Sequence, residues 1–147
     1  MTRILAFVFI VLFSLSAWGS DAMEEPETIF LDEDVEDLSQ FIWIKRPVIV
    51  FADSPNDPQF RQQMEYLRDR EAELAERDVI VLTDTNPSEP SPLRLLLRPR
   101  GFMLVLIGKD GGIKLRKPFP WSVREIGRSI DKMPLRQREI RERKEGG

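Results

Sequence analysis

The sequence contains neither cysteine nor histidine in its 147 residues. Without thiols the chain can form no disulfide, no thiolate metal site and no thiol nucleophile. Without imidazoles it has no histidine ligand and no histidine general base, so a serine-histidine hydrolase is excluded. Disulfide exchange is excluded too, because it proceeds through a thiolate. Any function must therefore use carboxylates, amines, guanidinium groups, hydroxyls or apolar surface.

Residues 1–19 have the pattern of a cleaved export signal. An apolar run over residues 4–15 is followed by Ala17 and Gly19, small residues of the kind that precede a signal cleavage site. The run is shorter than the ~20 residues that cross a bilayer, so no membrane span is expected after the signal is removed. We expect a periplasmic or secreted protein cleaved after Gly19, with cleavage after Ala22 as the alternative.

Charge is separated along the chain. Residues 21–40 hold nine acidic residues and no basic one, whereas residues 94–145 hold fifteen basic and six acidic residues. We expect residues 20–37 to form a flexible acidic leader, residues 38–134 to form the folded domain, and residues 135–147 to form an exposed charged tail. The leader either stays solvated or docks on the basic half of the chain.

Short apolar runs alternate with helix and turn signals along the rest of the chain. Residues 38–44 are apolar enough to pack, as either a short helix or an edge strand. The following order of strand, helix, strand, short helix, strand, hairpin, strand and helix reads as two β-α-β crossovers, a hairpin and a covering helix. This is the order of a thioredoxin-like α/β domain, with a mixed sheet of about four strands flanked by helices. The predicted elements cover residues 48–52, 58–77, 79–82, 93–97, 102–107, 113–116 and 122–133.

Three carboxylates follow the first two predicted strands. Asp53 and Asp57 come after the first strand and Asp84 after the second, so parallel strands would bring them to one edge of the sheet. Their oxygens could hold Mg²⁺ or Ca²⁺, or support a hydrolase. Helix caps and turns explain the same residues more simply. We expect no cofactor.

Basic residues of the second half, with one tryptophan, form the predicted binding surface. An envelope or extracellular protein is the expected partner. Nucleic acid is not, because the aromatic residues do not interleave with the basic ones as stacking platforms would. Trp121 also fits a hydrophobic staple that covers the core beside the capped last helix. The predicted surface consists of Lys109, Lys114, Arg116, Trp121, Arg124 and Arg136.

Residues 47–52, 104–116 and 130–136 resemble an uncharacterised family of thioredoxin-like domains. The stretch Gly-Lys-Asp-Gly-Gly-Ile-Lys-Leu-Arg at residues 108–116 is the most specific part. Members of the family are small exported bacterial proteins, and related domains occur in the sushi-repeat and coiled-coil-domain matrix proteins of animals. The resemblance implies a fold and a compartment but no reaction.

Comparison with thioredoxins indicates a vestigial redox site. Ser54 and Asp57 stand where the resemblance places the thiol pair, and the proline that thioredoxins have before the third strand is missing at residues 100–103. The sequence therefore favours an exported, non-catalytic, non-redox binding module. The alternative is a metal-binding protein or hydrolase that uses Asp53, Asp57 and Asp84.

Overall fold

The computed structural model describes residues 27–32 and 34–147. The predicted signal at residues 1–19, both cleavage positions and the start of the acidic leader lie outside the described residues. Within the described part, no helix combines the length and the hydropathy that a membrane crossing requires.

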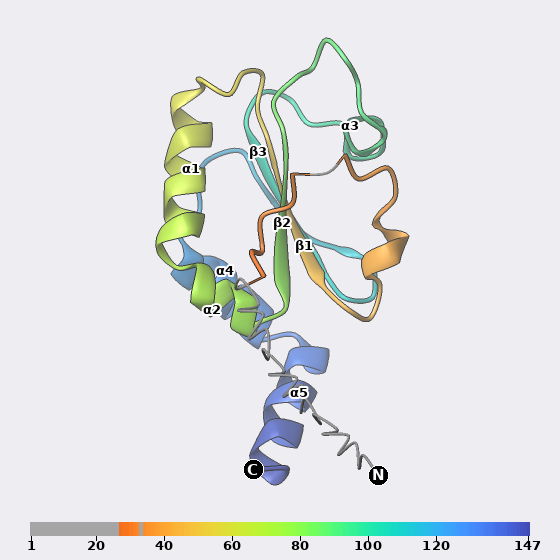
Figure 1. The fold of residues 1–147 in the computed structure, drawn as a ribbon, viewed down its shortest axis with the longest axis vertical. Coiled ribbons are helices and arrows are strands. Elements are labelled where there is room, and N and C mark those ends of the chain that lie inside the picture. The colour runs from red at the N-terminus through yellow and green to blue at the C-terminus, as the bar shows by residue number, and fades with distance from the viewer. Residues whose placement is uncertain (1–26, 33) are drawn as a thin grey trace, which may run out of the picture.

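Four strands of the described chain form one mixed sheet (Figure 1). They are β1 (Arg46–Phe51), β2 (Val79–Asp84), β3 (Met103–Ile107) and β4 (Ile113–Lys117), arranged in the order β2-β1-β3-β4. β1 runs parallel to β2 and antiparallel to β3, and β3 runs antiparallel to β4. With helices on both faces, the sheet confirms the predicted thioredoxin-like α/β class.

The two faces of the sheet support separate apolar cores. On one face lie α1 (Pro58–Asp69), α2 (Glu71–Glu76) and α4 (Val123–Asp131); on the other lie α3 (Pro92–Leu97) and the 3₁₀ helix η1 (Leu38–Phe41) (Figure 1). Because successive side chains of a strand point to opposite faces, a central strand covered on both sides must be apolar at every position. This is why short continuous apolar runs predicted the central strands correctly.

The prediction of two parallel crossovers is wrong for the second one. β3 runs antiparallel to β1, so the chain between β2 and β3 starts and ends at the same end of the sheet. Its helix, α3, has six residues and spans only about 9 Å, about half the length of a six-residue strand. A helix this short cannot by itself return the chain to the opposite end.

The predicted helix over residues 58–77 is divided in two at Arg70, whose backbone leaves the helical region. Glu71 occupies the position of the apolar stripe between Leu67 and Leu74. Its carboxylate accepts hydrogen bonds from the Thr28 hydroxyl and the Ile29 N–H (3.1 Å each) instead of packing in the core. The stripe is thus interrupted by a polar anchor, and the helix breaks beside it.

In the described part of the predicted acidic leader, residues 29–31 are fixed along β2. Ile29 is buried and accepts a hydrogen bond from the N–H of Val81 in β2 (2.8 Å), while Leu31 donates one to the Val81 carbonyl (3.0 Å). Figure 1 shows this segment running along β2, at the edge of the sheet opposite β4. Ile29 and Leu31, apolar residues in an otherwise acidic stretch, cover the sheet edge. A count of charges ignores these apolar residues and therefore predicted a flexible leader.

The charged segment after residue 134 also differs from the expected tail. It forms the helix α5 (Pro134–Glu145), which extends beyond α4 (Figure 1). Residues 141–147 are exposed as expected, but Arg136 is buried and Glu139 is half-buried. The first half of α5 is therefore part of the folded domain.

Candidate binding groove

Ser54 and Asp57, which the resemblance to thioredoxins puts at the redox pair, are capping residues in the structure. The Ser54 hydroxyl accepts a hydrogen bond from the Asn56 N–H (3.1 Å). Asp57 is the N-cap of α1, and its carboxylate accepts from the Gln59 N–H (2.8 Å) while Pro58 begins the helix. These side chains satisfy backbone donors that would otherwise lack partners. Ser54 and Asp57 therefore have a structural use.

The three candidate metal ligands do not form a metal site. Asp53 is exposed and Asp57 caps α1, whereas Asp84 is bound to Arg94 (2.9 Å) and accepts from the Ser91 hydroxyl (2.5 Å). Among the described residues, no three acidic side chains are placed to share a metal ion. Asp57 is a helix cap and Asp84 accepts from the Asn86 N–H in the turn after β2, as the interpretation of caps and turns predicts.

Asp84 and Arg94 form a nearly buried ion pair, with side chains 11% and 9% exposed. Arg94 also donates to the carbonyl oxygens of Ala52 and Asp84 (3.1 Å each). Burial alone would raise the pKa of Asp84, but the hydrogen bonds from Arg94 and Ser91 outweigh it and hold the pKa below its ordinary value. The pair ties α3 to the ends of β1 and β2.

The predicted binding surface is divided by the fold. Arg116 donates to the Leu97 carbonyl on the α3 face of the sheet, and Arg124 lies by α1 in a small separate pocket. Arg136 is buried and pairs with Glu139 and Asp131. These three residues do not share a surface with the rest of the predicted set.

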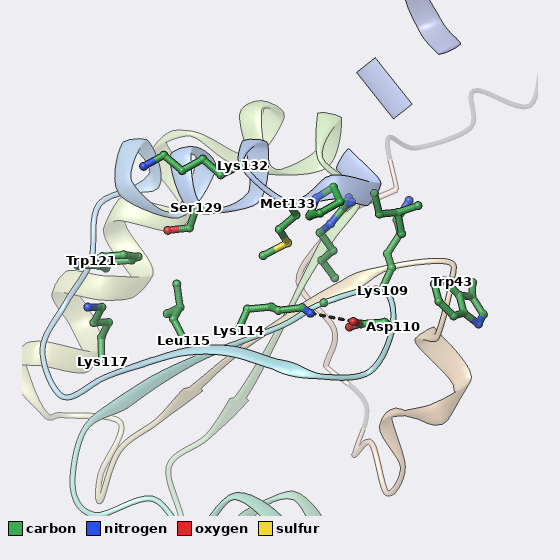
Figure 2. A pocket seen from close by; sticks show the side chains of 14 residues that line it. Trp43, Lys109, Asp110, Lys114, Leu115, Lys117, Trp121, Ser129, Lys132 and Met133 are labelled. Atoms are coloured by element: carbon green, nitrogen blue, oxygen red, sulfur yellow. Dashed lines mark hydrogen bonds and ion pairs between the residues drawn. The ribbon is translucent and has the colours of Figure 1, made fainter. Parts of the chain in front are cut away.

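Lys109, Lys114 and Trp121 do come together, in a groove between β4 and the junction of α4 and α5 (Figure 2). The cavity measures about 710 Å³, within the range of ligand-binding sites. In Figure 2, side chains of Lys114, Leu115 and Lys117 rise from β4, and Ser129 and Met133 face them from the other wall. The groove is lined by Trp43, Arg46, Gly108, Lys109, Asp110, Lys114, Leu115, Lys117, Trp121, Ser129, Lys132, Met133, Pro134 and Leu135.

Trp121 forms one end of the groove and is held in place by a residue that the sequence did not single out. Gln63 of α1 is completely buried, and its amide donates to the Trp121 carbonyl (2.9 Å) and accepts from the Trp121 N–H (2.7 Å). The indole ring packs against the core, in agreement with the covering role considered from the sequence. It also carries the Lys117 ammonium 4.5 Å from its ring centroid.

Trp43 lies at the opposite end of the groove (Figure 2). Its side chain is 67% exposed, and its backbone has a positive φ of 66°, which is rare for a bulky residue. The Trp43 N–H donates to the Lys109 carbonyl (2.6 Å), so the hairpin between β3 and β4 fixes this conformation. Strained backbone that presents an exposed aromatic ring is a feature of binding sites.

The lysines of the groove differ in how their charges are used. Lys109 is bound by both Asp78 and Glu139 (2.8 Å each), and Lys114 pairs with Asp110 (2.8 Å). For Lys117 and Lys132, the described chain provides no carboxylate within ion-pair distance. Lys109 is thus a structural cation, and Lys117 and Lys132 are the cations available to a ligand.

A cluster of ion pairs lies beneath the groove and fixes α5. Arg46, 1% exposed, donates to both carboxylate oxygens of Glu139 (3.1 and 3.2 Å) and to the Arg77 carbonyl (2.9 Å). Burial would raise the pKa of Glu139, but hydrogen bonds from Lys109 and Arg46 keep it below its ordinary value. The cluster neutralises the buried cations, so the charge of the groove comes from its rim.

The sequence model of a family described as "Domain of unknown function (DUF4174)" matches residues 37–139. The fold is similar to that of the reduced 2-Cys peroxiredoxin of Plasmodium vivax, with 17% identity and a TM-score of 0.54 over 69% of this chain and 84% of that chain. It is also similar to N-terminally modified Prx1a of Plasmodium yoelii, with 17% identity and a TM-score of 0.51 over 67% and 79%. These similarities confirm the predicted resemblance to an uncharacterised family with a thioredoxin-like fold.

Proposed function

The chain belongs to the DUF4174 family of domains of unknown function, and we propose that it is a non-redox binding domain whose ligand site is the groove between β4 and α4. Peroxiredoxin chemistry needs a cysteine thiolate, and the chain has no cysteine. The thioredoxin-like scaffold therefore serves another purpose than thiol chemistry.

The observation that carries the proposal is the composition of the groove. It combines an apolar floor at Leu115 and Met133, indole rings at both ends, and the ammonium groups of Lys117 and Lys132. The whole chain has a formal charge of −3, so this concentration of cations runs against the overall charge. Apolar walls with a few placed charges are typical of ligand sites.

The groove fits a ligand that is both anionic and apolar. Carboxylates would pair with Lys117 and Lys132 at the rim, and an apolar side chain would cover the floor. The export signal predicted at residues 1–19 places such a ligand in the periplasm or outside the cell. An acidic segment of an envelope or extracellular protein has the required chemistry.

The test uses the intrinsic fluorescence of the protein without residues 1–19. Trp18 leaves with the signal, so Trp43 and Trp121 are the remaining tryptophans, and both line the groove. We expect a blocked peptide that repeats Glu-Glu-Val-Val, so that each face of the extended chain carries both carboxylates and apolar groups, to shift their emission, with binding that weakens as salt is added. A peptide that repeats Lys-Lys-Val-Val is expected to leave the emission unchanged.

Two variants distinguish the groove from other basic surface. Lys117→Glu combined with Lys132→Glu is expected to abolish the shift. Arg124→Glu changes charge in the same sense on α4 but outside the groove, and is expected to have little effect. Equal loss in both variants, or no response to the acidic peptide, would contradict the proposal.

A further inference from the structure

We propose that β4 receives an extended acidic peptide as an added strand, with its side chains alternating between the groove and the α3 face. This inference rests on the proposed function, because it identifies the class of ligand that occupies the groove. It also commits to a backbone contact that binding in the groove does not require.

The outer edge of β4 is available for such a strand. β4 ends the sheet, and no strand of the described chain pairs with its outer side. The opposite edge is treated differently, because Ile29 and Leu31 hydrogen-bond to Val81 and so cover β2. An uncovered strand edge offers backbone donors and acceptors to another chain.

The leader is an example of a segment that pairs with an edge of this sheet, and its composition can be compared with that of the proposed partner. Residues 29–31 pair with β2 and Val35 packs against the core on the α3 face, in a stretch of sequence that combines acids with apolar residues. The proposed partner has the same composition and adds to the other edge. Because β4 is basic, an acidic segment has a more favourable electrostatic interaction with the edge at β4 than with the edge at β2.

β4 carries three basic residues and no acidic one: Lys114, Arg116 and Lys117. Basic side chains on an edge strand oppose pairing with a second copy of β4, because like charges would stand opposite each other. They attract an acidic strand for the same reason. The composition of β4 therefore selects against self-association and in favour of an acidic partner.

The irregular register of β4 brings Lys114, which pairs with Asp110, to the groove beside the ammonium group of Lys117, which is unpaired within the described chain. The pairing with β3 shifts between Leu106 and Ile107, so that Lys114 lines the groove together with Leu115 and Lys117. Figure 2 shows these side chains on the same side of the strand. An added strand would place its groove-facing residues among these side chains and Trp121, and its other residues beside Arg116.

Backbone methylation tests the added strand directly. A strand presents one alternate set of its N–H groups to its partner and turns the other set away. The probes are the blocked Glu-Glu-Val-Val repeat peptide and two derivatives, each N-methylated on one alternate set of amides. We expect one derivative to bind at least about tenfold more weakly than the parent and the other to bind like the parent.

The outcomes separate this inference from the proposed function. Unequal binding of the two derivatives, with slower amide exchange in β4 when the parent is bound, supports the added strand. Equal binding of the parent and both derivatives overturns the added strand and leaves the groove as a site for acidic ligands. Failure of the parent peptide to bind overturns both proposals.

Discussion

At the scale of single residues, buried polar side chains fix the groove more firmly than its exposed ones. Gln63 is the clearest case, because both ends of its amide serve the backbone of Trp121. Replacing it with an apolar residue leaves a backbone donor and an acceptor of the groove wall without their partner. Buried polar groups that lose their partners are destabilising.

We predict that Gln63→Leu lowers the free energy of unfolding by about 1–3 kcal/mol and shifts the emission of Trp121 to longer wavelength. Denaturant unfolding followed by fluorescence measures both effects. Gln62→Leu is the matched control, since Gln62 is exposed on the same helix. An equal response of the two variants would contradict the role assigned to Gln63.

The Asp84–Arg94 pair predicts a defined dependence of stability on pH. Because the pKa of Asp84 is lowered by folding, its ionised form stabilises the fold above the ordinary value of 3.8. That contribution is lost as the pH falls through the folded pKa. Asp84→Asn removes the charge at every pH and leaves Arg94 without its carboxylate.

We expect Asp84→Asn to lower the free energy of unfolding by about 3 kcal/mol at neutral pH. The difference from the unmodified protein should shrink below pH 3.8, where Asp84 itself becomes protonated. Asp53→Asn alters an exposed carboxylate and should follow the unmodified protein throughout. Thermal unfolding at a series of pH values gives the comparison, and a constant difference would refute the assignment.

Residue roles were predictable where the partner is close in sequence. The capping box of Ser122 and Glu125 and the cap at Asp57 follow from spacings of two or three residues. Gln63 and Trp121 are 58 residues apart, and no local pattern signals their contact. The sequence predicts an exposed Arg136, because a guanidinium group is usually solvated. In the structure Arg136 is buried and three carboxylates surround it.

At the scale of elements, α5 depends on ion pairs more than on apolar contacts. Its sequence alternates basic and acidic residues, and its first half is fixed by Glu139 and Arg136. Arg46 already has one buried nitrogen, Nε, without a hydrogen-bond partner among the described residues. Loss of Glu139 would leave this buried cation without its carboxylate.

We therefore predict that Glu139→Gln releases α5 and lowers the free energy of unfolding by about 3 kcal/mol. Amide hydrogen exchange should become faster along α5 and at Arg46, Asp78 and Lys109, the described partners of the cluster. Glu142→Gln changes the same charge at an exposed position of α5 and should leave exchange unaltered. Unchanged protection of α5 in Glu139→Gln would show that the ion pairs do not hold the helix.

Elements were predictable where the sequence contains both an apolar run and a turn signal. The β3–β4 hairpin and α3 follow from such local signals. The direction of β3 does not follow from a local signal, because it depends on the distance that the connection between β2 and β3 can span. The break at Arg70 depends on Glu71 meeting Ile29, a contact across 42 residues.

At the scale of the whole molecule, the two edges of the sheet differ in charge and in whether another segment of the described chain covers them. The edge at β2 is covered by acidic chain, and the edge at β4 is basic and borders the groove. The sequence revealed the separation of charge, the order of elements typical of a thioredoxin-like fold, and the absence of the thiols that redox chemistry needs. It could not reveal that the acidic segment covers the far edge, because sheet order is a property of the assembled fold.

We propose, as the central claim, that this domain binds through the groove at β4 and not at residues 53–57 beside the end of β1. The most direct measurement is NMR mapping of the isotope-labelled protein without residues 1–19, titrated with the blocked Glu-Glu-Val-Val repeat peptide. We expect the changes in amide chemical shift to be concentrated in β4 and around Trp121 and Lys132. Shifts concentrated at residues 53–57 and at Asp84, with β4 unaffected, would contradict it.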